Sequence, residues 1–294
     1  MEDHNDDIVR AQEQDDRLNE AFWSLPDDLE GILSRLHDPD PIVRLAVIDK
    51  LGGFGEPREV TALMEALDDE SGPVRRDASL AFAAVSPGRA VAVTEQAVPS
   101  ISRHALEDDR DDVRMHCVMA LARAEDVDVT SVLESALDDS GEFVRAAACW
   151  SLATQYSDRS RERMIGLLLD SSPYVRYECA LSLVEMEVKD ARLVEGIQRF
   201  EDDELVEAVA EEREEVEIQG RVMQTHPETR QLLEEWLDGL DPEQPEEGPE
   251  FLDFVRERLG ESEVPFPPQD PIGDLLQKAR KLLSESGNSE EHAT

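Results

Sequence analysis

Apolar and charged residues recur along the middle of this chain in a nine-residue motif. A Leu is followed two positions later by an Asp, and five positions after that by a Val-Arg pair. The motif occurs at Leu36/Asp38/Val43/Arg44, Leu67/Asp69/Val74/Arg75, Leu106/Asp108/Val113/Arg114, Leu137/Asp139/Val144/Arg145 and Leu168/Asp170/Val175/Arg176. Its valines are 31, 39, 31 and 31 residues apart. A period of this size is typical of an array in which each repeat is one supersecondary unit.

Each Val-Arg pair opens a stretch whose apolar residues share one helix face, for example Val144, Ala148 and Leu152. A second amphipathic stretch, such as residues 60–67, precedes the next motif. Because one helical hairpin cannot bury both apolar stripes, neighbouring hairpins are expected to stack. The pattern predicts an all-α fold, a right-handed α-α superhelix of about six helical hairpins, followed by an irregular helical and acidic C-terminal region.

The motif and the Ala-rich helix after it resemble the HEAT-repeat superfamily, an armadillo-type fold, and in particular its short phycobilisome-lyase-type repeat. The resemblance covers about residues 27–215. In that family the recurrent Asp and Arg form a ladder between neighbouring units. The resemblance therefore implies a structural ladder here, made of Asp38, Arg44, Asp69, Arg75, Asp108, Arg114, Asp139, Arg145, Asp170 and Arg176.

Departures from the motif suggest where the array ends. Val206 lies 31 residues after Val175 but is followed by Glu207, so the sixth unit is expected to be a degenerate, polar cap. We expect three parts. Residues 1–26 form an acidic tail and capping segment, residues 27–220 form the HEAT-like solenoid, and residues 221–294 form an acidic, Pro-rich region with short amphipathic helices.

The last region contains three apolar clusters, at residues 232–240, 251–259 and 272–283. Each cluster either seals the end of the solenoid or inserts into a groove on a partner. Sealing is favoured for the first cluster, and both alternatives stay open for the last. The candidate partner contacts in these clusters are Trp236, Leu275 and Leu276.

The chain is strongly acidic, with 29 Lys and Arg against 70 Asp and Glu and a net charge of -41. Binding to nucleic acid is therefore disfavoured, because most of the surface repels phosphate. Four basic residues are Lys and the rest are Arg, a balance typical of salt-adapted proteins, although an ordinary acidic scaffold is the alternative. No apolar run approaches the length of a membrane span, so we expect a cytoplasmic protein without membrane insertion.

The sequence offers little that indicates catalysis. It has no phosphate-binding loop, nucleophile elbow or His-Glu-x-x-His helix, and its six histidines are never paired at ligand spacing. It also lacks the His-Glu dipeptides that hold iron in deoxyhypusine hydroxylase, a HEAT-type enzyme. We therefore predict no catalytic residue, metal or cofactor. Arg159, Arg161 and Arg163 could bind a carboxylate or phosphate on a partner, or could neutralise acids on a neighbouring repeat.

These observations favour a non-enzymatic scaffold that binds another protein on a concave face lined by the second helices of the repeats. The resemblance implies an adaptor role, as in signalling or taxis, or a role as an assembly factor. One alternative is a lyase-like or chaperone-like helper that acts on a bound chromophore or cofactor. Another is an acidic mimic of nucleic acid. The identity of the partner and the oligomeric state do not follow from the sequence.

Overall fold

The computed structural model describes residues 15–51, 57–84, 93–124, 127–155, 158–211, 213, 254, 258 and 270–290. All regular secondary structure in these residues is helical, which confirms the predicted all-α repeat fold. The chain divides into two compact units, Met1–Leu167 (unit 1) and Leu168–Thr294 (unit 2). The domain boundaries expected near residues 26 and 220 stay predictions.

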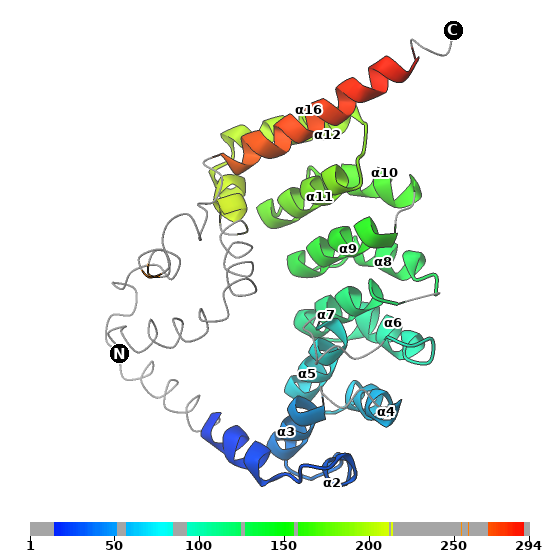
Figure 1. The fold of residues 1–294 in the computed structure, drawn as a ribbon, viewed down its shortest axis with the longest axis vertical. Helices are drawn as coiled ribbons and strands as arrows, with labels where there is room; N and C mark the ends of the chain where they lie inside the picture. Colours follow the sequence, from blue (N-terminus) through cyan, green and yellow to red (C-terminus); the bar gives the residue numbers. More distant parts are fainter. Residues whose placement is uncertain are drawn as a thin grey trace. The chain divides into compact units, whose positions relative to one another are not determined.

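Unit 1 consists of helices that alternate between two layers (Figure 1). The Val-Arg pairs open the helices of one layer, which we call the Val-Arg layer: α3 (Pro41–Leu51), α5 (Gly72–Ala83), α7 (Asp111–Leu121) and α9 (Glu142–Gln155). The second layer holds α4 (Pro57–Ala66), α6 (Val98–Glu107), α8 (Thr130–Ala136) and α10 (Asp158–Leu167). Residues 15–24, also helical, and α2 (Leu29–Leu33) precede α3.

The Asp of each motif shapes the turn that leads into a Val-Arg helix. Asp69 Oδ1 accepts a hydrogen bond from the amide of Ser71 at 2.7 Å, and Asp139 Oδ1 accepts one from the amide of Gly141 at 2.7 Å. Such a side chain occupies a backbone donor that would otherwise lack a partner at the start of a helix. The same residue type therefore begins the helix in every repeat.

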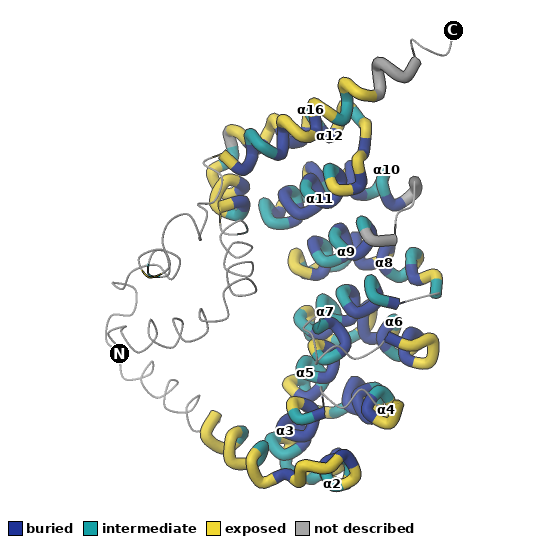
Figure 2. The backbone as a smooth tube through the Cα atoms, in the orientation of Figure 1, coloured by how far each residue is buried: buried dark blue, intermediate teal, exposed yellow. Residues whose placement is uncertain are grey.

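The core of unit 1 lies between the two layers, where most of the motif valines and leucines are buried (Figure 2). Val74, Val113 and Val144 are almost fully buried, and each such side chain stabilises the fold by about 1.5–3 kcal/mol. Leu67 is fully buried, whereas Leu106 is 42% exposed. The apolar half of the motif thus supplies the hydrophobic spine of the array.

Repeats in unit 1 contact each other mainly through the Val-Arg layer. Helix α5 packs closely against α3 and α7, and α7 packs closely against α9, whereas successive helices of the second layer make fewer contacts. In a stack of hairpins, the layer with the closer helices lies on the inner side of the bend. Within unit 1 the concave side is therefore the Val-Arg layer, and the expectation that the second helices line it was wrong.

Unit 2 contains α11 (Pro173–Glu185), α12 (Ala191–Gln198), the short 3-10 helix η1 (Arg199–Asp202), a helical stretch at 204–211, and α16 (Pro271–Glu290). Helix α16 packs against α12, α11 and η1. Its buried side chains include Leu275 and Leu276, which are 3% and 2% exposed. Both leucines are buried within unit 2, as the sealing alternative requires, and the partner contact considered for them from the sequence stays a prediction.

Candidate functional site

Arginines of the Val-Arg helices join consecutive repeats of unit 1 through paired hydrogen bonds. Arg44 Nε and Nη2 donate to Asp69 Oδ2 and Oδ1 at 2.7 and 2.8 Å. Arg114 makes the same contact with Asp139, at 2.8 Å for both bonds. Each Arg thus binds the Asp of the following motif in the planar two-point geometry that suits a guanidinium and a carboxylate.

The same arginines also hold the turn of their own repeat. The Nη1 atoms of Arg44 and Arg114 each donate to the carbonyl of the motif Asp six residues earlier, Asp38 or Asp108, at 2.9 Å. Arg145 and Arg176 bind their own turns in the same way. Each of these side chains therefore donates a hydrogen bond to the backbone of its own repeat. The side chains of Arg44 and Arg114 also bind the Asp of the next repeat.

In this ladder, hydrogen bonds and opposite charges affect the pKa of the carboxylates more than burial does. Burial alone would raise the pKa of Asp139, but the hydrogen bonds from Arg114 and the Gly141 amide outweigh it and hold the pKa below its ordinary value. Hydrogen bonds to Asp139 likewise raise the pKa of Arg114. The pair is therefore ionised over the whole physiological pH range, and its role is structural.

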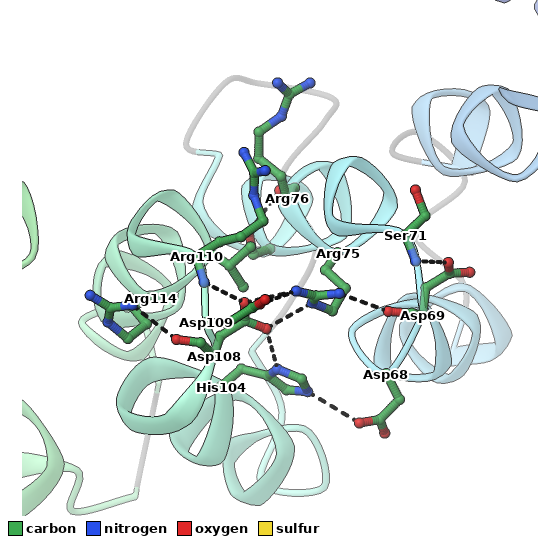
Figure 3. A network of polar contacts seen from close by, with 12 residues as sticks. Asp68, Asp69, Ser71, Arg75, Arg76, His104, Asp108, Asp109, Arg110 and Arg114 are labelled. Atoms are coloured by element: carbon green, nitrogen blue, oxygen red, sulfur yellow. Dashed lines mark hydrogen bonds and ion pairs between the residues drawn. The ribbon is translucent and has the colours of Figure 1, made fainter. Parts of the chain in front are cut away.

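The third repeat adds a histidine to the ladder (Figure 3). Arg75 Nε donates to Asp108 Oδ2 at 2.9 Å, and the buried His104 places Nδ1 3.0 Å from the same oxygen. The His104 Nε2 atom lies 3.2 Å from Asp68 Oδ1 of the preceding repeat, beside Arg103. Burial favours a higher pKa for Asp108, but these donors and the Arg110 amide lower it to about 2.

Unit 2 contains a ladder residue that the motif does not identify. Arg176 Nη2 donates to the carboxylate of Asp203, which also accepts the amides of Leu205 and Val206 at 3.2 and 3.4 Å. The motif spacing before Val206 points to Glu201 instead, two residues earlier. The signal that could have identified Asp203 is its position directly before a helical stretch, where Asp commonly caps a helix.

Of the three arginines of α10, Arg163 is the one for which the described residues show contacts with the preceding repeat. Arg163 Nη1 donates to the carbonyl of Glu134, and its Nη2 atom donates to Asp138 Oδ2 at 2.5 Å. Arg161 is partly buried, and the side chain of Arg159 lies outside the described residues, as does the whole of Trp236. The contacts of Arg163 correspond to the alternative in which it neutralises acids on a neighbouring repeat.

A surface hollow of about 420 Å³ lies in the second layer, between α4 and α6. It is lined by Thr61, Met64, Glu65, Asp68, Pro99, Ser100 and Arg103. The lining contains neither His nor Cys, although Asp68 connects it to the buried His104. It is an open hollow with both apolar and charged lining residues, and it does not resemble an enclosed pocket.

The Val-Arg layer carries a row of large apolar side chains that sequence reasoning missed. The residue six positions after the motif Val is Leu80 on α5, Met119 on α7 and Trp150 on α9. Helix α5 packs against α7, and α7 packs against α9, so the three residues occupy equivalent positions on neighbouring helices. Leu80 is 46% exposed, and Met119 and Trp150 are partly exposed. We call these three residues the apolar row.

Polar side chains of α5 and α7 contact one another within the Val-Arg layer. Ser79 Oγ lies 3.3 Å from His116 Nδ1 and donates to the Arg76 carbonyl at 2.7 Å. Burial lowers the pKa of His116, while Asp112 acts in the opposite direction. Because the Ser79 hydroxyl is fully buried, a substrate could not reach it. The contact between Ser79 and His116 is therefore structural.

The described part of the chain contains neither a cluster of metal ligands nor a membrane-spanning helix. No group of three or more His, Cys, Asp or Glu residues in these ranges is arranged to hold a metal ion. None of the described helices combines the length and the apolar character needed to cross a membrane.

Comparison with solved structures gives distant similarities. A designed armadillo repeat protein in complex with a (KR)4 peptide is 15% identical, with 87% of this chain and 99% of that chain covered and a TM-score of 0.42. Human deoxyhypusine hydroxylase is 20% identical, with 64% and 73% covered and a TM-score of 0.32. The Escherichia coli protein YibA is 13% identical, with 91% and 95% covered and a TM-score of 0.38.

Family comparison is more informative than these individual similarities. No curated protein sequence matches the chain significantly. A family model described as HEAT repeats matches residues 21–84, 88–153 and 102–184, which together make up more than half of the chain. These matches include the Val-Arg helices α3, α5, α7, α9 and most of α11. The chain belongs to the HEAT-repeat family.

Proposed function

We propose that this protein is a non-enzymatic scaffold that binds another protein on the Val-Arg layer of unit 1. The observation that supports the proposal is the apolar row, Leu80, Met119 and Trp150. Three large apolar side chains at one register position, left partly exposed to water, form a surface typical of a protein interaction site. Trp in particular is enriched among the residues that dominate binding energy.

The rest of unit 1 uses its polar side chains to hold the fold together. The guanidinium groups of Arg44 and Arg114 donate hydrogen bonds both to their own repeat and to the next one, and Arg163 is bound to the preceding repeat. The apolar row takes no part in the hydrogen bonds of this ladder, and its side chains are partly exposed to water. A partner that covers the row would gain binding energy without disturbing the ladder.

The cellular setting that we propose is a salt-adapted cytoplasm. A net charge of -41 produces strong self-repulsion in dilute buffer. The screening length falls from about 10 Å at 0.1 M salt to about 3 Å at 1 M salt, so this repulsion becomes weak in a concentrated salt solution. An adaptor role in signalling or taxis, or a role as an assembly factor, is compatible with such a scaffold.

The two alternative functions have less support. A lyase-like or chaperone-like helper would need an enclosed apolar pocket with a reactive His or Cys, whereas the hollow between α4 and α6 is open and has neither residue in its lining. A mimic of nucleic acid would need rows of free carboxylates. In unit 1 the motif carboxylates Asp69, Asp108 and Asp139 are instead bound by arginines of the ladder.

The proposal can be tested by capturing partners from the native host at its own salt concentration, with crosslinking to map the contact. We expect Trp150→Ala and Leu80→Ala to reduce capture at least tenfold, as is usual for central apolar contacts. The matched control is Leu106→Ala, because Leu106 is 42% exposed but lies on α6 in the second layer. If Trp150→Ala and Leu80→Ala capture as much partner as the control Leu106→Ala, the proposal is refuted.

A further inference from the structure

We infer that His104 is a pH-sensitive switch between the second and third repeats of unit 1. In its neutral form the ring accepts a hydrogen bond from Arg103. After it gains a proton, the ring donates to Asp68 and releases Arg103. The inference is independent of the proposed function, because none of these residues belongs to the apolar row.

The two ring nitrogens of His104 have different neighbours (Figure 3). Nδ1 lies 3.0 Å from Asp108 Oδ2, so we assign a proton to this nitrogen, which donates to the carboxylate. Nε2 lies 3.0 Å from Arg103 Nη2, a donor, and 3.2 Å from Asp68 Oδ1, an acceptor. Nε2 without a proton can accept from Arg103 but cannot donate to Asp68, and protonated Nε2 can only donate. The partner of Nε2 therefore depends on the charge of the ring.

The carboxylates on both sides of the ring stay ionised at the pH values at which histidine changes its charge. Burial acts to raise the pKa of Asp68, but hydrogen bonds from Arg103 and His104 help to hold it below its ordinary value. Burial likewise acts to raise the pKa of Asp108, but hydrogen bonds, the strongest of them from Arg75, lower it to about 2. Histidine is the side chain that ordinarily changes charge between about pH 5 and 8. A change of partners in this range therefore depends on the ring and not on its acceptors.

The other charged groups around this site come from the elements that pack against α6 and the turn after it. They are Arg75 on α5, Asp109 and Arg110 in the turn before α7, Asp112 in the first turn of α7, and Glu65 on α4. On α8, the buried Glu134 accepts a hydrogen bond from Ser160 at 3.1 Å. A second histidine, His37, is 83% exposed and lies 3.7 Å from Glu65. Its titration has to be separated from that of His104 by substitution.

Arg103 has room to leave the ring. Its side chain is 46% exposed and lines the hollow between α4 and α6. Its Nη2 atom donates to Asp68 Oδ1 at 2.5 Å as well as facing His104 Nε2. Once Nε2 is protonated, two donors would lie 3.0 Å apart and compete for the same oxygen, so the guanidinium turns toward the hollow. Proton uptake thus transfers the bond between the repeats from the exposed Arg103 to the buried His104.

Nuclear magnetic resonance of the full-length protein tests this inference, at one salt concentration and between about pH 8 and 5. The shifts of labelled histidine ring nitrogens report which nitrogen carries a proton. Hydrogen exchange of the guanidinium group reports whether Arg103 is bound. The reference for exchange is Arg58, whose pair with Glu30 is an exposed contact between repeats at 2.6 Å. The control variant is His37→Gln.

We expect the His104 ring to carry a proton on Nδ1 and none on Nε2 at about pH 8, and a proton on both nitrogens at about pH 5. Exchange of Arg103 relative to Arg58 should be about fivefold faster at the lower pH, as the loss of one hydrogen bond of average strength implies. In Arg103→Met the ring should gain its second proton at a higher pH, because the donor that competes with this proton is gone. His37→Gln should change none of these results.

Three outcomes would overturn the inference. The first is an Nε2 atom that keeps the same protonation state from about pH 8 to 5. The second is an exchange ratio of Arg103 to Arg58 that does not change with pH. The third is a His104 titration that Arg103→Met leaves unchanged, which is the result expected if the histidine only fills space between the repeats.

Discussion

Substitution Arg114→Met tests whether the ladder is a structural requirement of the array. Arg114 and Asp139 are both 11% exposed and are joined by two hydrogen bonds of 2.8 Å. Met preserves most of the aliphatic packing but removes the charge. Asp139 would then keep its buried carboxylate with only the Gly141 amide as a donor.

The expected loss can be estimated from this geometry. Removing one partner of a buried ion pair costs about 3–5 kcal/mol, and the slight exposure of this pair places it near 3 kcal/mol. A loss of 1 kcal/mol shifts the melting temperature of a unit of this size by about 2–4 °C. We therefore expect the melting temperature of Arg114→Met to fall by about 6–12 °C. Circular dichroism and urea denaturation at fixed salt would measure it.

Two further variants isolate the cause of this loss. Arg58→Met breaks an exposed inter-repeat pair with Glu30, and such pairs contribute little. It should leave the unfolding midpoint nearly unchanged. In the double variant Arg114→Met with Asp139→Asn, no buried charge remains, and Asn can still accept the Gly141 amide. We expect it to recover much of the lost stability. If Arg114→Met is no more destabilising than Arg58→Met, our reasoning about the ladder is wrong.

Three other predictions concern acid stability, the C-terminal helix and α10. The pKa of Asp108 is about 2, below its ordinary value near 4, so its contribution of about 2 kcal/mol is present above pH 4 and is lost as the pH falls through 2. Acid titration followed by circular dichroism should show this loss, and Asp108→Asn should remove it. Leu276→Ala should destabilise unit 2 by about 2–5 kcal/mol and increase hydrogen exchange in α16, whereas an unchanged exchange rate would contradict the sealing role. Arg163→Gln should cost less than about 1 kcal/mol in urea denaturation, because Asp138 is largely exposed, and a strong loss of partner capture would return Arg163 to the binding surface.

The sequence was sufficient to predict the helices and their stacking, because these depend on local patterns. The motif Val and Leu recur at spacings that place them on one helix face, and residues such as Val113 and Leu67 are buried as this periodicity requires. Asp69 and Asp139 begin the helices of their repeats by accepting backbone amides two residues later, which is a property of Asp in turns.

The candidate site could not be predicted in the same way. Leu80, Met119 and Trp150 share a register but not a residue type, so no motif marks them. Which layer is concave depends on distances between helices of different repeats, and a one-dimensional pattern does not contain these distances. Asp203 could not be predicted for a related reason. In the last unit the acid that binds Arg176 lies two residues after the position that the motif spacing gives.

The two-sided contacts of the ladder arginines make adjacent repeats energetically dependent on one another. If the repeat that carries Asp139 opened locally, Arg114 would lose its carboxylate partner while its own turn remained folded. Local opening therefore destabilises the neighbour, which favours cooperative unfolding of unit 1 over fraying one hairpin at a time. A shortened array cut between repeats would expose an unmatched guanidinium or carboxylate at the new end. Such an array would need a terminal acid that plays the part of Asp203 in unit 2.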